Sequence, residues 1–251
     1  MKKIIISLLA IVAVTAAFAT TPTILGQTGG YAVPNAYVAD DVVIAASQNL
    51  NDDFDGVAFP TVSLTVPIGN AVEVSGVYAS AGYVRAGRRG PVARYRVDDA
   101  VLYGFGAKVA IPVNFFSTDL ALGVGYNRLD GTNEVSAYAA ISKEVVNNLV
   151  VTANANYFSS ESTRRGRTRT NDGFTYKFNI DAAVSDNVNL GVDFALGNTE
   201  FSVTDRYFGQ SYASTANVYA DVAVSDNFSI KAAMTNLSHD TDFVVGAAFS
   251  F

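Results

Sequence analysis

The sequence contains no cysteine and no tryptophan, and it has a single histidine. The lack of cysteine excludes a disulfide framework, a thiolate metal site and a lipid-modified N-terminal cysteine. Beyond the first residues, no apolar run approaches the roughly 18 residues expected of a membrane-spanning helix. The chain is nevertheless 49% hydrophobic and only 16% charged, so its apolar residues must be distributed in another way.

The N-terminus has the pattern of an export signal. Lys2 and Lys3 form a basic start, residues 4–16 are apolar or small, and residues 17–19 read Ala-Phe-Ala, the A-x-A form of a cleavage site. A transmembrane anchor is the alternative, but the apolar stretch is shorter than the roughly 20 residues that a spanning helix needs. We predict a signal peptide over residues 1–19 of the 251-residue chain.

Apolar and polar residues alternate through most of the remaining chain. In residues 174–184 the even positions are apolar, whereas the odd positions include Lys177 and Asp181. Because successive side chains of a strand point to opposite faces, such a segment has one apolar and one polar face. About ten residues is the length with which a tilted strand crosses a membrane. The pattern predicts strands at 36–48, 59–68, 71–82, 99–112, 119–128, 133–144, 149–159, 173–184, 188–198, 213–224, 228–237 and 242–251.

The connections between these strands alternate in length. The short ones are residues 69–70, 114–118, 145–148, 185–187 and 225–227. The mostly longer ones are residues 49–58, 83–98, 129–132, 160–172, 199–212 and 238–241. Short periplasmic turns and longer outer loops are typical of outer-membrane barrels, whereas a soluble β-sandwich, the alternative, does not need this asymmetry. We predict an all-β, antiparallel transmembrane β-barrel over residues 36–251, most simply with 12 strands (10 are possible), in the bacterial outer membrane with both termini periplasmic.

The triplet Ser-Asp-Asn stands at two of the predicted short turns, residues 185–187 and 225–227. We predict three-residue turns that end on an asparagine with positive φ, a conformation that asparagine tolerates. With this register Asp221 lies opposite Lys231, as an ion pair across two strands.

The last residues resemble a known assembly signal. The chain ends on Phe249-Ser250-Phe251 after an alternating strand, which is similar to the C-terminal signal of Gram-negative outer-membrane barrels. The resemblance implies that the barrel-assembly machinery reads Phe249 and Phe251.

A second resemblance concerns the region after the predicted cleavage site. Residues 22–29 (Pro-Thr-Ile-Leu-Gly-Gln-Thr-Gly) and 34–36 (Pro-Asn-Ala) resemble a G-x-T-G…P-x-A opening of envelope barrels linked to exopolysaccharide export, although Gly30-Tyr31 departs from the usual aliphatic continuation. The segment 20–35 could hang in the periplasm or plug the lumen. The sequence leaves both alternatives open.

Charged residues within the predicted strands must point inward, since an ionised side chain facing lipid at mid-bilayer costs a few kcal/mol. Most of them lie near the predicted periplasmic turns. This belt could form a constriction that sorts solutes by charge, or an ion network that fills a narrow barrel. Its members are Glu73, Lys108, Lys177, Asp181, Asp193, Asp221 and Lys231.

Nine of the eleven arginines fall in two predicted outer loops, although the protein is acidic overall. The guanidinium group matches phosphate and carboxylate, so we predict contacts with envelope anions such as lipopolysaccharide; a merely solvated loop is the alternative. Nucleic acid is not an expected partner in this compartment. The nine are Arg85, Arg88, Arg89, Arg94, Arg96, Arg164, Arg165, Arg167 and Arg169.

No motif predicts a metal, a cofactor or a catalytic centre. Residues 51–56 (Asn-Asp-Asp-Phe-Asp-Gly) open like a calcium loop, but the glutamate of its twelfth position is absent. His239, between Ser238 and Asp240, lacks a triad arrangement.

Three hypotheses for function follow from these patterns. The first is a porin-like channel for passive diffusion of small hydrophilic solutes, and thus no enzyme. The second is a non-conducting structural or surface-interaction barrel that binds envelope anions, with lipopolysaccharide and membrane lipid as its partners. The third is an outer-membrane barrel hydrolase. The oligomeric state and the identity of a solute stay open.

Overall fold

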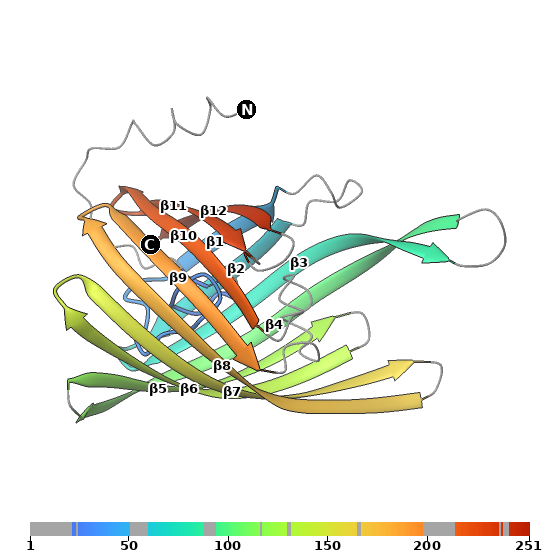
Figure 1. Ribbon diagram of the computed structural model, residues 1–251, viewed down its shortest axis with the longest axis horizontal. Helices are drawn as coiled ribbons and strands as arrows, with labels where there is room; N and C mark the ends of the chain where they lie inside the picture. The colour runs from blue at the N-terminus through green and yellow to red at the C-terminus, as the bar shows by residue number, and fades with distance from the viewer. Residues whose placement is uncertain are drawn as a thin grey trace.

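The computed structural model is a closed barrel in which each strand pairs with its neighbours in sequence and the last pairs with the first (Figure 1). It describes residues 22–23, 25–50, 60–87, 94–115, 117–129, 132–164, 167–197, 214–235, 237 and 241–251. The prediction of a 12-stranded antiparallel barrel is confirmed. The strands are β1 (Val43–Asn49), β2 (Pro60–Ile68), β3 (Val72–Gly87), β4 (Arg94–Phe115), β5 (Thr118–Leu129), β6 (Thr132–Val146), β7 (Leu149–Arg164), β8 (Arg167–Ser185), β9 (Val188–Gly197), β10 (Ser214–Ser225), β11 (Phe228–Thr235) and β12 (Asp242–Ser250).

The barrel is apolar outside and polar inside. Phe105, Val124 and Phe174 point outward and are 66%, 56% and 57% exposed, whereas Lys108 and Asn179 are fully buried within. In water this distribution would be unfavourable, but in a bilayer the outer face meets lipid and the polar groups are shielded. The fold is therefore that of a transmembrane barrel. Among the described residues, no helix is long and apolar enough to cross a membrane.

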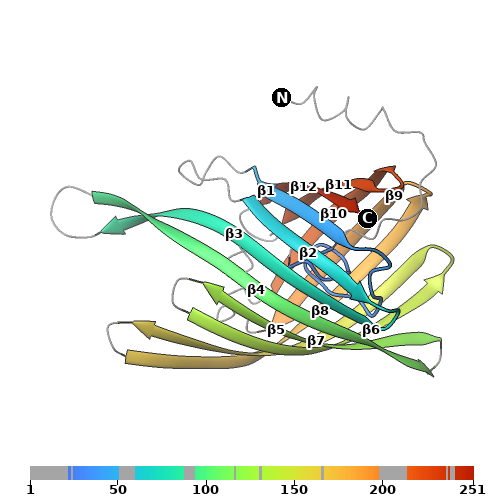
Figure 2. The same ribbon diagram turned by 180° about the vertical axis from the view of Figure 1, so that it is seen from behind.

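Two of the predicted outer loops are in fact continuations of strands. β3 and β4 remain paired as far as Gly87 and Arg94, and β7 and β8 as far as Arg164 and Arg167. Figure 2 shows the β3–β4 hairpin reaching well beyond the rest of the barrel. Outside the membrane both faces of a hairpin meet water, so the apolar alternation stops although the backbone ladder continues. For that reason the prediction of loops was wrong over residues 83–87, 94–98, 160–164 and 167–172, which are strand; residues 88–93 and 165–166 lie outside the described residues.

The first strand begins later than predicted, at Val43 and not at residue 36. Residues 36–41 are not part of the strand ladder, and the Val42 carbonyl accepts from the Phe251 amide at 3.0 Å, next to the β1–β12 pairing. Instead, the Ala36 amide donates to the Ser142 hydroxyl (2.9 Å) and the Ala39 amide to a Glu73 carboxylate oxygen (3.0 Å). Since both acceptors are buried, residues 36–39 belong to the interior of the barrel, whereas Asp40 and Asp41 are exposed.

The two Ser-Asp-Asn turns differ from the prediction. Ser185 pairs with Val188 and Ser225 with Phe228, so each turn has two residues, and the ladder register shifts just before each serine. Such bulges increase the local twist of the strands. Among the described non-glycine residues, positive φ occurs at Ser117 and Asn148 only, not at the predicted asparagines.

The predicted pairing of Asp221 with Lys231 across β10 and β11 is confirmed. The Lys231 Nζ lies 4.0 Å from an Asp221 carboxylate oxygen. The register shift lies between this pair and the turn, so it changes the turn without changing the pair.

Candidate functional site

The N-terminal residues 22–39, with Ile24 not described, form a folded element that we call the lumen segment. Its chain folds back on itself through bridges between Pro22 and Thr28 and between Gly29 and Pro34. Thr28 and Val33 are each 1% exposed. The segment is bonded to strands on opposite sides of the closed ring, and both views show it enclosed by them (Figures 1 and 2). It therefore lies inside the lumen.

The first anchor of the lumen segment is the buried pair Glu73 and Lys108, on β3 and β4. One Glu73 oxygen accepts from the Thr28 amide at 2.9 Å, and the other accepts from the Thr28 hydroxyl and from the Ala39 amide. The Lys108 Nζ lies 3.4 Å from Glu73 and donates to the Thr28 carbonyl at 3.0 Å. Both side chains are fully buried, so each charge depends on the other and on the segment for its polar partners.

The second anchor is Asp193 on β9, on the other side of the lumen. Its Oδ2 accepts from the Ala32 amide at 2.6 Å, and its Oδ1 accepts from the Asn179 side chain at 2.8 Å. Asn179 also donates to the Tyr219 hydroxyl at 2.7 Å, and that hydroxyl donates to Asp181. A network from three strands thus holds the acceptor in position.

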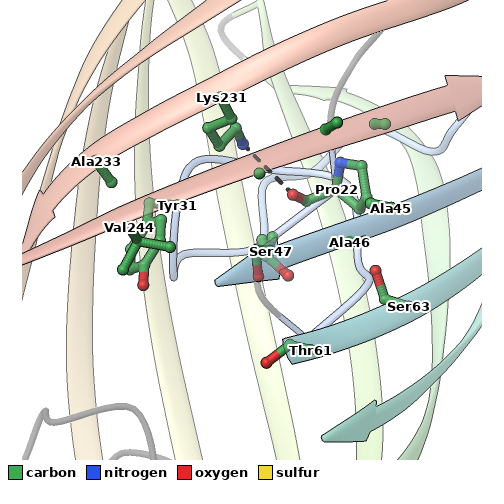
Figure 3. Close-up of a pocket in the computed structure, with 14 residues that line it drawn as sticks. Pro22, Tyr31, Ala45, Ala46, Ser47, Thr61, Ser63, Lys231, Ala233 and Val244 are labelled. Atoms are coloured by element: carbon green, nitrogen blue, oxygen red, sulfur yellow. Dashed lines mark hydrogen bonds between the residues drawn. The ribbon is translucent and has the colours of Figure 1, made fainter. Parts of the chain in front are cut away.

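A third anchor is Lys231 on β11, which faces both the segment and Asp221. Its ammonium group donates to the carbonyl oxygens of Gly30 (3.2 Å) and Pro22 (3.4 Å), the latter drawn in Figure 3. It also lies 5.2 Å from the centre of the Tyr219 ring, within the range of a cation–π contact.

Glycine is required at two places in the segment because the walls approach so closely. A Cβ on Gly30 would lie 2.5 Å from the Asn179 amide nitrogen and 2.6 Å from Asp193 Oδ1. Gly26 has a φ of +83° and its carbonyl accepts from the Thr65 hydroxyl on β2. The Gly-x-x-Gly-Gly pattern of residues 26–30 therefore fits the place that the segment occupies in the lumen.

Tyr31 packs in the interior with Ala233 and Val244. Burial raises the pKa of the Tyr31 hydroxyl, and the negative charges of Asp193 and Asp242 raise it further.

The seven charges of the predicted belt fall into separate groups. Glu73 and Lys108 form one, and Asp181, Asp193 and Asp221 surround Lys231 in another. Lys177 lies apart, in a cavity on the loop side that Glu134 also lines. These charges are arranged mainly around the lumen segment, a feature that sequence reasoning did not specify.

Uncharged polar side chains of the barrel wall also bind the lumen segment, and the sequence analysis did not identify them. The Asn154 amide donates to the Pro34 carbonyl at 3.3 Å, and Ser142, which accepts from Ala36, shares a 2.8 Å hydrogen bond with Thr152. The signal that could have found them is their position on the polar, inward side of the alternation.

The predicted arginine clusters lie on or beside the two long hairpins. Arg85 and Arg96 face each other in the ladder, as do Arg164 and Arg167. Arg167 and Arg169 have exposed side chains. Arg88, Arg89 and Arg165 lie outside the described residues.

At the C-terminus the Phe249 and Phe251 rings meet edge to face, with centroids 4.9 Å apart, and both are exposed outward. The Ser250 amide donates to the Asn227 carbonyl at 2.9 Å, which ties this end to a short turn.

Within the described part of the chain, no three Asp, Glu, His or Cys side chains are arranged to hold a metal ion. Residues 51–56 and His239 lie outside the described residues, so the interpretations made for them stay predictions.

Comparison with known proteins agrees with this geometry. The KdgM porin superposes with a TM-score of 0.62 at 16% identity, over 84% of this chain and 99% of that one. The NanC porin gives 0.55 at 6% identity, and the outer-membrane protein Omp33 of Acinetobacter baumannii 0.50 at 13%; each match covers 84% of this chain and 98% of the other.

The chain has the fold of outer-membrane porins. No protein-family model matches the sequence, and no curated protein matches it by sequence. At these identities the likeness concerns the fold alone, so function has to be argued from the lumen.

Proposed function

We propose that this protein is a porin-like channel of the bacterial outer membrane that lets small hydrophilic solutes diffuse through a lumen narrowed by the lumen segment. Residues 1–19 act as the export signal, and the short turns and both termini face the periplasm. The observation that carries the proposal is the inverted distribution of side chains, with an apolar outer face and a charged, hydrogen-bonding interior. Since the interior of a transmembrane barrel is polar in open channels and in plugged barrels alike, the charge-lined space beside the lumen segment is what favours a channel over a sealed scaffold.

The inward charges have a double role in this proposal. They bind the lumen segment, and those that border open space form the constriction for solutes. A cavity at the end of the short turns, which we call the turn-end cavity, is lined by Asp181, Asp221 and Lys231. Charges of both signs at one narrow place discriminate solutes by their charge distribution.

Planar-bilayer recording tests the channel directly. Purified wild-type protein is expected to give small, discrete conductance steps, because the seated segment occupies much of the cross-section. Neutralising Asp181 and Asp221 together should alter the ratio of cation to anion permeability, whereas neutralising the exposed Asp226 at a turn should not. Protein that is folded by its heat-modifiable migration but gives no steps would contradict the channel and favour the structural barrel.

The long hairpins support a second candidate function, binding of envelope anions. The two hairpins bring Arg85 opposite Arg96 and Arg164 opposite Arg167. Arg167 and Arg169 have exposed side chains on this part of the β7–β8 hairpin, and the guanidinium group is suited to phosphate. We propose lipopolysaccharide phosphates as the anion that these hairpins bind.

The arginine proposal predicts salt-sensitive binding of lipopolysaccharide. Changing Arg167 and Arg169 to Gln should weaken the binding and reduce its dependence on salt, since screened charge contacts are lost. Lys143→Gln, an exposed cation near the opposite end of β6, serves as the control and should change neither quantity. Binding that does not vary with salt in the wild-type protein would count against charge recognition.

Two further assignments belong to the same proposal. Phe249 and Phe251 are read by the barrel-assembly machinery during insertion, in keeping with their exposure at the end of β12. We also propose that the protein is not an enzyme; the hydrolase alternative rests on His239, which lies outside the described residues.

A further inference from the structure

The cavity beside Lys177 lies between the lumen segment and the wall formed by β3 to β8. It contains about 610 Å³ of space that no atom fills, part of it open to solvent. We call it the loop-side cavity, because its lining includes Asn127 and Glu134, which pair near the connection from β5 to β6. A polar space of this kind is wide enough for several water molecules.

Most of the polar side chains that line the loop-side cavity are uncharged. They include Gln27 of the lumen segment, Ser75, Asn127, Ser136, Asn154 and Asn156. A carboxamide carries both hydrogen-bond donors and acceptors, and so does a serine hydroxyl. These side chains therefore match the hydroxyl groups of a solute, which also donate and accept.

Small residues on the wall make room for these polar groups. Ser75, Gly106, Gly125 and Ser136 pair in one row across β3, β4, β5 and β6. A Cβ on Gly106 would lie 2.6 Å from the Gln27 amide nitrogen and 2.8 Å from the Ser75 hydroxyl oxygen. The glycine therefore lets a side chain of the segment and one of the wall approach each other, so that both border the same space.

The charges of the loop-side cavity balance. Among the described residues that line it, Glu134 and Lys177 carry a charge, one of each sign. The turn-end cavity differs, because three aspartates and one lysine line it. A charged solute therefore gains no net attraction in the loop-side cavity, and hydrogen bonds decide what binds there.

We infer that the loop-side cavity is a binding site for neutral, hydroxyl-rich solutes, that is, small sugars and polyols. The inference rests on the proposed channel function and deepens it, because it names the solute class. Solute hydroxyls replace water on the same polar groups, so the binding is weak, as it must be in a channel from which the solute leaves again. Through Gln27 the lumen segment contributes to this site as well as narrowing the lumen.

Saturation-transfer NMR of the whole protein in micelles tests the site, because it detects weak binding and needs no conductance. Glucose is the probe, and the wild-type protein is expected to bind it. Asn127→Leu/Asn156→Leu, which replaces both carboxamides by apolar groups of the same branched shape, should bind it more weakly. Each lost uncharged hydrogen bond lowers the affinity roughly two- to twelvefold. The matched control is Asn189→Leu, at a carboxamide that lines the turn-end cavity, and it should leave the affinity unchanged.

The charge of the solute and a thiol label give two further measurements. Glucuronate and glucosamine should bind no more tightly than glucose, because the lining has no net charge. Ser136→Cys, the single thiol in a chain without cysteine, should react with a bulky water-soluble reagent in the folded protein. Labelling should then lower the glucose affinity severalfold relative to the same variant before labelling. This comparison holds even if the double variant fails to fold.

Other results would overturn the inference. A glucose affinity that neither the double variant nor the label changes would mean that glucose binds elsewhere. A thiol at position 136 that does not react, or a charged sugar that binds severalfold more tightly than glucose, would contradict the site or its solute class. Wild-type protein that conducts but binds no glucose would refute the site and leave the channel, whereas glucose binding without conductance steps would contradict the channel alone.

Discussion

Gly30→Leu is expected to raise the single-channel conductance severalfold. The Cβ alone would approach Asn179, Asp193 and Tyr219 to within 2.5, 2.6 and 2.8 Å. These three side chains are bonded to one another, at 2.8 Å and 2.7 Å from the Asn179 amide, and cannot move apart without breaking buried hydrogen bonds. The rest of the leucine side chain has no room either, so the segment must move away from this part of the wall. The residues of the barrel wall are unchanged, so the barrel itself should stay folded.

Release of the segment should also make it accessible to protease. The Ala32 amide would lose its contact with Asp193, and the carbonyl of residue 30 would lose its contact with Lys231. Limited proteolysis should then cut within residues 22–39 of the variant but not of the wild-type protein. Asp40→Leu, an exposed position just beyond the segment, is the control and should behave like wild type in both measurements.

Conductance equal to wild type in Gly30→Leu, together with cleavage of the segment, would mean that the segment does not limit the current. The narrowing would then have to lie elsewhere in the lumen. Unchanged conductance without cleavage would instead mean that the seat adapts to a larger side chain.

Much of the barrel could be predicted from the sequence because the boundary between lipid and the polar interior dictates how apolar and polar residues alternate. Lipid on one side and polar groups on the other force alternation, so the crossing strands and the inward direction of Glu73 and Lys108 followed from the cost of a charge in lipid. Where both faces meet water, as in the tips of the β3–β4 and β7–β8 hairpins, that boundary is absent and the prediction ended too early.

The position of the lumen segment and its contacts with the barrel wall could not be predicted in the same way. Thr28 bonds to Glu73 and Ala32 to Asp193, contacts that are 45 and 161 residues apart in the chain. No local period encodes such a pairing, and the glycines that permit it read equally well as a flexible linker. The alternation from residue 36 onward even predicted a strand there, because burial against the inner wall also selects small and apolar residues.

Glu73→Gln is expected to be the most destabilising single change at the anchors. The amide keeps one oxygen where the carboxylate has two, so at least one of the donors at Thr28 and Ala39 loses its acceptor. Lys108, fully buried, loses the negative charge 3.4 Å away and keeps the Thr28 carbonyl as an acceptor. Leaving one partner of a buried ion pair uncompensated costs roughly 3–5 kcal/mol. Reversible urea unfolding in micelles should show this loss, and the conductance should rise as the segment loosens.

The double variant Glu73→Gln/Lys108→Met separates the ion pair from the remaining contacts. Removing both charges leaves no buried charge unpaired, so the double variant should be more stable than Glu73→Gln alone, although the segment keeps fewer bonds. Its conductance should nevertheless stay above wild type, because Thr28 has then lost both its carboxylate acceptor and the ammonium donor to its carbonyl. If the losses of unfolding free energy in the two single variants add up to the loss in the double variant, the two charges do not depend on each other. The hydrogen bonds from the segment alone would then account for the stability of this anchor.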